Sequence, residues 1–200
     1  MIGARMQEFS RRTVERMIAP LGRTNLDPNA LTIAGFAMSF ATATVIALGW
    51  RQVGGVLVLI TGGFDMLDGA LARVRKVNST FGAFLDSTLD RWAEGVIFTG
   101  IMWYLEANDF RLEAVLAMTT LVGSMLISYT RARAEGLGLE CKVGVLQRPE
   151  RLLLLGVALL GPHWFMTGAF WVLAVTTQAT ALQRVFHVHR QIERQKGDRT

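Results

Sequence analysis

Residues 65–90 of the chain read DMLDGALARVRKVNSTFGAFLDSTLD, and this stretch decides how the rest of the sequence is interpreted. It carries four aspartates, Asp65, Asp68, Asp86 and Asp90, among apolar runs that are long enough for membrane helices. A charged residue near the centre of a bilayer costs about 2.5–3.5 kcal/mol on insertion scales. Four carboxylates in such a setting therefore indicate a functional site that binds cations or lines a wet cavity.

The composition is typical of a membrane protein. Hydrophobic residues make up 51% of the chain and charged residues only 18%, whereas charged residues are roughly 25% of soluble domains. The single cysteine, Cys141, excludes an internal disulfide, and no Cys/His spacing indicates a zinc site. We expect an all-α integral membrane protein with one catalytic domain and no nucleic-acid partner.

Six apolar runs predict six transmembrane helices, because a span needs about 20 residues to cross a ~30 Å hydrocarbon core. The Gly161-Pro162-His163 sequence could also form a turn within a continuous apolar stretch. The expected spans are Ala30 to Trp50, Val53 to Ala72, Phe81 to Leu105, Leu112 to Tyr129, Leu152 to Met166 and Gly168 to Phe186.

The residues before the first span predict an amphipathic interfacial helix, since apolar side chains recur there at helical spacing opposite arginines. A disordered basic leader is the alternative, and no cleavable signal peptide is expected. We therefore divide the chain into a juxtamembrane segment (1–28), a six-helix membrane domain (29–190) and a cytoplasmic tail (191–200).

Basic residues in the connections predict the topology, because Lys and Arg accumulate on the cytoplasmic side. The N-terminal segment, the second and fourth connections and the C-terminal region hold eighteen of them, and the other side holds only Arg51 and Arg111. A multi-pass protein of the cell membrane is expected, with both termini and the aspartate cluster on the cytoplasmic side.

The spacing of the aspartates favours a metal site. Asp65 and Asp68 are three residues apart and Asp86 and Asp90 are four apart, so each pair projects from one face of its helix. Four convergent carboxylates repel one another unless cations neutralise them. We expect the carboxylates to bind two Mg²⁺ ions, or Mn²⁺ in their place. Two such ions suit nucleophilic displacement at phosphorus.

The full pattern D-x2-D-G-x2-A-R-x8-G-x3-D-x3-D resembles the signature of the CDP-alcohol phosphotransferases, integral membrane enzymes of phospholipid synthesis. All eight specified positions are present, including Gly69, Ala72, Arg73 and Gly82. The resemblance implies a homodimer and a CDP-activated lipid, CDP-diacylglycerol, as donor. Arg73 alone could also be an ordinary cytoplasmic-side arginine.

The resemblance also implies roles for individual residues. Asp65, Asp68 and Asp86 would be metal ligands, and Asp90 would be both a ligand and the catalytic base that takes the proton of the attacking hydroxyl. The residues expected at the CDP-lipid are Asn29, Thr32, Asp68, Gly69, Ala72, Arg73 and Ser79.

A second cluster, in residues 128–151 and at Arg184, concerns the acceptor alcohol. It resembles the phosphatidylinositol phosphate synthase branch of the family, in which a basic pocket receives inositol 1-phosphate. An acceptor that carries a phosphate needs several guanidinium donors, whereas a neutral alcohol does not. The pocket residues expected on this basis are Arg131, Arg148, Arg151 and Arg184.

Other interpretations remain open at this point. Glycerol 3-phosphate is the main rival acceptor, which would make the protein a phosphatidylglycerophosphate synthase, and an ether-lipid donor would make it an archaetidylinositol phosphate synthase. The arginines could instead follow the positive-inside rule or bind anionic headgroups. An ion-coupled transporter is the non-enzyme alternative, because intramembrane carboxylates also line ion pathways.

Overall fold

The computed structural model describes the backbone of residues 28–75 and 80–197 and the side chains of residues 29–63 and 80–196. The predicted interfacial helix lies outside these ranges. Within them the chain is all-helical, as predicted, and forms six helices. They are α2 (Pro28–Ala47), α3 (Arg51–Arg75), α4 (Thr80–Ala107), α5 (Arg111–Glu135), α6 (Arg148–Leu160) and α7 (His163–Gly197).

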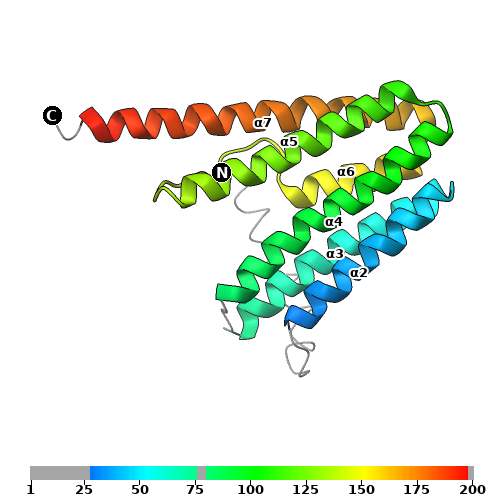
Figure 1. Ribbon diagram of the computed structural model, residues 1–200, viewed down its shortest axis with the longest axis horizontal. Coiled ribbons are helices and arrows are strands. Elements are labelled where there is room, and N and C mark those ends of the chain that lie inside the picture. Colours follow the sequence, from blue (N-terminus) through cyan, green and yellow to red (C-terminus); the bar gives the residue numbers. More distant parts are fainter. Residues whose placement is uncertain (1–27, 76–79, 198–200) are drawn as a thin grey trace, which may run out of the picture.

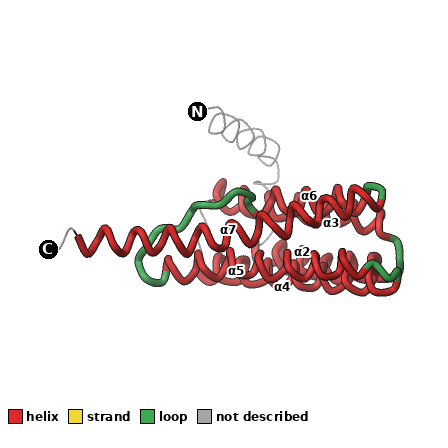
Figure 2. The backbone as a smooth tube through the Cα atoms, turned by 90° about the horizontal axis from the view of Figure 1, so that it is seen from above, coloured by secondary structure: helices red, strands yellow, loops and turns green. Residues whose placement is uncertain are grey.

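The six helices form a closed ring in which each packs mainly against two neighbours. The order around the ring is α2, α4, α5, α7, α6, α3 and back to α2. Figure 2 shows the helices lying side by side along a common direction, with α2, α4 and α5 in one layer and α3 and α6 in the other. Consequently α4 and α6 lie opposite each other across the interior.

Glycines allow two of these helix pairs to approach closely, as small residues do in membrane bundles. A Cβ on Gly55 of α3 would lie 2.8 Å from the carbonyl oxygen of Gly156 on α6. A Cβ on Gly100 of α4 would collide with the backbone of Ala43 on α2. Because Phe36 also contacts Trp92, α2 and α4 run parallel.

The two ends of the ring differ in chemistry. At one end, here called the turn end, short turns join α2 to α3, α4 to α5 and α6 to α7. Exposed tryptophans occur near these turns, as they do at membrane interfaces: Trp50, Trp103 and Trp164. The other end, here called the site end, is where α2, α4 and α6 begin and α3 and α5 end.

The apolar core fills the half of the ring nearer the turn end. All six helices contribute to it, for example through Ile46, Val58, Ile101, Leu155 and Phe170, which are at most 2% exposed. In α4 the core residues begin at Ile97, seven residues after Asp90. The half of the interior that contains Asp90 is therefore free for polar side chains.

The predicted boundary between the last two spans was wrong. α6 ends at Leu160 and α7 begins at His163, so the break falls at Gly161-Pro162 and not near Gly168. Proline cannot donate a backbone hydrogen bond and disfavours helix in the preceding residue. Arg51 Nη1 also donates to the Gly161 carbonyl oxygen at 2.6 Å, which ties this turn to the start of α3.

Three helices in the described part of the chain are long and apolar enough to cross a bilayer, namely those at Asn29–Ala47, Arg111–Glu135 and His163–Lys196. α6 has 13 residues and is only about 20 Å long at 1.5 Å per residue. Six helices are thus confirmed in the residues that the structure describes, while six full crossings remain a prediction.

α7 is longer than its predicted span, as Figure 1 shows in orange and red. It continues past Phe186 to Gly197, so residues 191–197, which were predicted as part of a cytoplasmic tail, are helical. Its extension supports the connection between α5 and α6, whose Leu139 and Cys141 are buried against Val188 and Ile192. Gln191 Nε2 donates to the Glu140 carbonyl oxygen at 2.7 Å, so the connection lies along α7.

Candidate active site

The predicted metal ligands come from the site ends of α3 and α4. Asp65 and Asp68 lie in the last three turns of α3, and their side chains are outside the described residues. Asp86 and Asp90 lie in the first three turns of α4, both partly buried. α3 ends at Arg75 and α4 begins at Thr80, so these helix ends are at most about 18 Å apart along an extended chain. Figure 1 shows both ends on the same side of the molecule.

Asp90 is the centre of the described part of this site. Arg148 Nη1 forms an ion pair with Asp90 Oδ2 at 2.8 Å, and Arg91 Nη1 lies 3.4 Å from the same oxygen. Arg148 Nη2 also lies 3.4 Å from the Asp90 carbonyl oxygen. Because Arg148 begins α6, this ion pair crosses the interior of the ring. It links a predicted metal ligand directly to a predicted acceptor-pocket arginine.

Arg91 connects α4 to α5 beside Asp90. Its Nε donates to Ser128 Oγ at 2.8 Å, and its Nη1 donates to the Ser87 carbonyl oxygen at 3.2 Å. Sequence reasoning placed Arg91 inside the third span without a role. Its position next to Asp90 was the signal that could have identified it.

A second ion pair lies one helical turn deeper than Asp90. Arg151 Nη2 is 3.9 Å from Glu94 Oε1, and both side chains are at most 6% exposed. Ser124 Oγ bridges them, because it donates to Glu94 Oε1 at 2.6 Å and accepts from Arg151 Nη2 at 2.9 Å. Glu94 and Ser124 were missed by sequence reasoning. Because a carboxylate is costly in an apolar span, Glu94 could have been identified as a residue that needs specific partners.

The four predicted pocket arginines occupy different positions. Arg148 and Arg151 are one turn apart on α6. Arg184 of α7 donates to the Val143 carbonyl oxygen at 2.9 Å and to the Ile127 carbonyl oxygen at 2.5 Å, so it holds the α5–α6 connection. Arg131, near the end of α5, is half exposed and pairs with Glu135 at 2.9 Å. All four belong to the site half of the ring, and Arg148 and Arg151 are the pair that faces α4.

The predicted CDP-lipid residues divide between described and undescribed parts of the chain. Asn29 and Thr32 lie in the first turns of α2, partly buried and at the site end. The α3 backbone carries Asp68, Gly69, Ala72 and Arg73, whose side chains are not described, and Ser79 lies outside the described residues. The first turns of α2 and α4 therefore share one end of the ring with the end of α3.

The donor set fits a hard divalent cation. Asp86 and Asp90 offer carboxylate oxygens from successive turns of one helix at partial burial, and oxygen ligands of this kind suit Mg²⁺ or Mn²⁺. The described side chains alone hold no group of three or more His, Cys, Asp or Glu residues. The α3 aspartates, whose side chains are not described, are the further ligands that the sequence predicts.

The family model of the CDP-alcohol phosphatidyltransferases matches residues 25–181. The chain belongs to this family. The matched range contains all four aspartates and the arginines of α6. The family assignment made from the aspartate spacing is confirmed.

Two individual members of the family are similar to this chain over most of its length. The phosphatidylinositol phosphate synthase of Mycobacteroides abscessus is 37% identical over 191 residues, covering 90% of this chain and 87% of the relative. The archaetidylinositol phosphate synthase of Methanothermobacter thermautotrophicus is 37% identical over 190 residues, covering 92% and 94%. Both named relatives form inositol-phosphate lipids.

Solved structures of one relative share the fold. The phosphatidylinositol phosphate synthase of Mycobacterium tuberculosis with CDP-DAG bound matches with a TM-score of 0.77 and 35% identity, covering 88% of this chain and 94% of that chain. The same enzyme in complex with manganese and citrate matches with a TM-score of 0.75 and 34% identity, covering 89% and 88%. This family member therefore binds a CDP-lipid and a divalent metal in the same fold.

Proposed function

We propose that the protein transfers the phosphatidyl group of CDP-diacylglycerol to a hydroxyl of inositol 1-phosphate, which releases CMP and forms phosphatidylinositol phosphate. The observation that carries the proposal is the Asp90–Arg148 ion pair of 2.8 Å. It joins the carboxylate of the family signature to the basic residues expected at an acceptor phosphate. Relatives that form inositol-phosphate lipids support the choice of acceptor.

In the proposed reaction the acceptor hydroxyl attacks the lipid-side phosphorus, the bond from that phosphorus to the CMP oxygen breaks, and CMP leaves. Asp90 takes the hydroxyl proton, and Arg131, Arg148, Arg151 and Arg184 bind the acceptor phosphate. Asn29, Thr32, Gly69, Ala72, Arg73 and Ser79 would bind the CDP-lipid together with Asp68. Two Mg²⁺ or Mn²⁺ ions, held by Asp65, Asp68, Asp86 and Asp90, would neutralise phosphate charge.

We also propose that the site end faces the cytoplasm, with both termini on that side, and that the protein is a homodimer of six-span subunits in the cell membrane. The concentration of basic residues at the site end supports this orientation. An ether-lipid donor is a second candidate, supported by the archaetidylinositol phosphate synthase relative.

The test is CMP release by the purified protein in detergent with CDP-diacylglycerol, Mg²⁺ and one acceptor at a time. We expect release that depends on both metal and inositol 1-phosphate, with neutral inositol inactive. Release with glycerol 3-phosphate alone would leave the family chemistry intact and overturn the acceptor. A transporter would release no CMP under any condition.

A further inference from the structure

Glu94 is a buried carboxylate for which the proposed reaction has no role. It is 4% exposed, and among the described residues only Glu113 is an equally buried carboxylate. Taking a carboxylate out of water is unfavourable unless a cation and hydrogen-bond donors compensate. A chain that keeps Glu94 in this position therefore has to satisfy it by specific partners.

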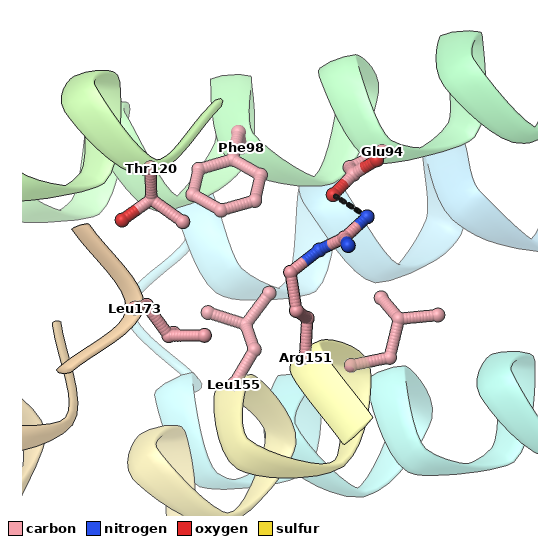
Figure 3. Close-up of a pocket in the computed structure, with 7 residues that line it drawn as sticks. Glu94, Phe98, Thr120, Arg151, Leu155 and Leu173 are labelled. Atoms are coloured by element: carbon pink, nitrogen blue, oxygen red, sulfur yellow. Dashed lines mark ion pairs between the residues drawn. The ribbon is translucent and has the colours of Figure 1, made fainter. Parts of the chain in front are cut away.

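Those partners are Ser124 and Arg151, which both contact Glu94 Oε1, while Glu94 Oε2 is buried without a hydrogen-bond partner among the described residues. Ser124 donates to Glu94 and accepts from Arg151, so its hydroxyl couples the carboxylate to the guanidinium. Arg151 Nη1 additionally lies 3.3 Å from the Leu146 carbonyl oxygen. Figure 3 shows the guanidinium reaching from α6 to Glu94 on α4, with Phe98 and Leu155 beside it. Apolar walls of this kind strengthen the electrostatic attraction.

The Glu94, Ser124 and Arg151 unit lies one helical turn from the Asp90–Arg148 ion pair of the candidate active site. Glu94 follows Asp90 by one turn on α4, and Arg151 follows Arg148 by one turn on α6. Two ion pairs therefore connect the same two helices at successive levels. α6 packs mainly on α3 and α7, and α4 packs mainly on α2 and α5. The Arg151 side chain reaches from α6 to polar partners on α4 and α5 and to the Leu146 carbonyl oxygen.

We propose that Glu94 is a positioning residue that sets the affinity for the acceptor phosphate by fixing Arg151 through Ser124. The inference rests on the proposed function, in which Arg151 belongs to the acceptor pocket. Without the carboxylate, the guanidinium loses its anionic anchor and its fixed rotamer. The acceptor then binds a less ordered pocket, whereas the CDP-lipid, for which other residues are proposed, is unaffected.

The test measures KM for inositol 1-phosphate and for CDP-diacylglycerol in Glu94→Gln. We expect the acceptor KM to rise roughly 10-fold, the lower end for a charge-assisted hydrogen bond, while the CDP-lipid KM stays within about twofold. Glu113→Gln is the matched control, because Glu113 is buried to the same extent and accepts a hydroxyl hydrogen bond from Thr167 at the turn end. The control should leave both KM values unchanged.

A double-variant cycle tests whether Glu94 acts through Arg151. In Arg151→Met protein, a further Glu94→Gln change should leave the acceptor KM within about twofold. Ser124→Ala should raise the acceptor KM in the same selective way, and it replaces Glu94→Gln if that variant does not fold. An unchanged acceptor KM, an equal rise for both substrates, or full additivity in the cycle would overturn the inference. A wild-type protein that does not use inositol 1-phosphate would instead overturn the proposed function.

Discussion

Asp90 is held by two arginines, and this arrangement defines its chemistry at the scale of single residues. Arg148 approaches it from across the ring and Arg91 from its own helix. The family resemblance implies two roles for this carboxylate, as a metal ligand and as the acceptor of a hydroxyl proton.

Asp90→Asn should abolish turnover while CDP-lipid binding persists. The amide can occupy the same place but cannot take the proton of the attacking hydroxyl, and general base catalysis contributes ~10²–10⁴-fold. Asp65→Asn should weaken metal binding as well. Single-turnover CMP release and a CDP-lipid binding assay measure the two effects. Turnover like that of the wild type in Asp90→Asn would remove this residue from the base role.

Arg184→Ala should raise the KM for inositol 1-phosphate by roughly 10- to 150-fold, because it deletes a charge-assisted contact worth about 1.5–3 kcal/mol. Arg151→Ala should show the same selective defect. Arg190→Ala, an exposed arginine two turns further along α7, is the control. Arg184 also holds two backbone carbonyls. Equal increases in KM for both substrates would therefore point to a structural effect and contradict the acceptor role.

Contacts between residues that are far apart in the chain could not be predicted from the sequence. The spacing of the four aspartates was sufficient to predict the family, because residues on one face of a helix are close together in sequence. The contact between Asp90 and Arg148 joins residues 58 positions apart. The Glu94, Ser124 and Arg151 unit joins three helices. Such pairs are decided by which helices face each other across the ring.

At the scale of elements, hydrophobicity predicted the interiors of the helices correctly but misplaced some of their ends. Five predicted spans overlap the cores of α2 to α5 and α7, since apolar length is a strong signal. The end of α6 was misplaced because apolar residues continue on both sides of Gly161-Pro162. The extension of α7 was missed because residues after Phe186 are polar, and their helix is stabilised by packing on the α5–α6 connection.

Gly100→Ala tests the close contact of α2 and α4. The added methyl group meets the Ala43 backbone, which has no flexible side-chain end that could move away. Overpacking of this kind costs about 1–3 kcal/mol, so the melting temperature in detergent should fall. Gly95→Ala on the same helix is the control, because nothing lies within 4 Å of its added Cβ. Unchanged melting of Gly100→Ala would contradict the tight α2–α4 packing.

At the scale of the whole molecule, the polar half of the ring and the apolar half are arranged along the membrane normal in the proposed orientation. The turn end carries three exposed tryptophans, and the site end carries the aspartates and most arginines. A soluble phosphorylated acceptor then enters from the cytoplasm, while the lipid donor enters from the bilayer. In this proposal a water-soluble and a membrane-soluble substrate meet at the site end.

Thiol labelling in intact cells measures this orientation. In a Cys141→Ser background, Asn108→Cys marks the turn end and Glu140→Cys marks the site end, and both positions are exposed. A membrane-impermeant maleimide should label Asn108→Cys in intact cells and Glu140→Cys only after the membrane is opened. The reverse pattern would contradict a cytoplasmic active site.

The central claim is the identity of the acceptor, and a competition experiment tests it most directly. Purified protein is given CDP-diacylglycerol, Mg²⁺ and equal concentrations of inositol 1-phosphate and glycerol 3-phosphate, and the lipid products are measured by mass spectrometry. We expect phosphatidylinositol phosphate to dominate, with its formation matched by CMP release and abolished in Asp90→Asn. A product dominated by phosphatidylglycerol phosphate would contradict the assignment.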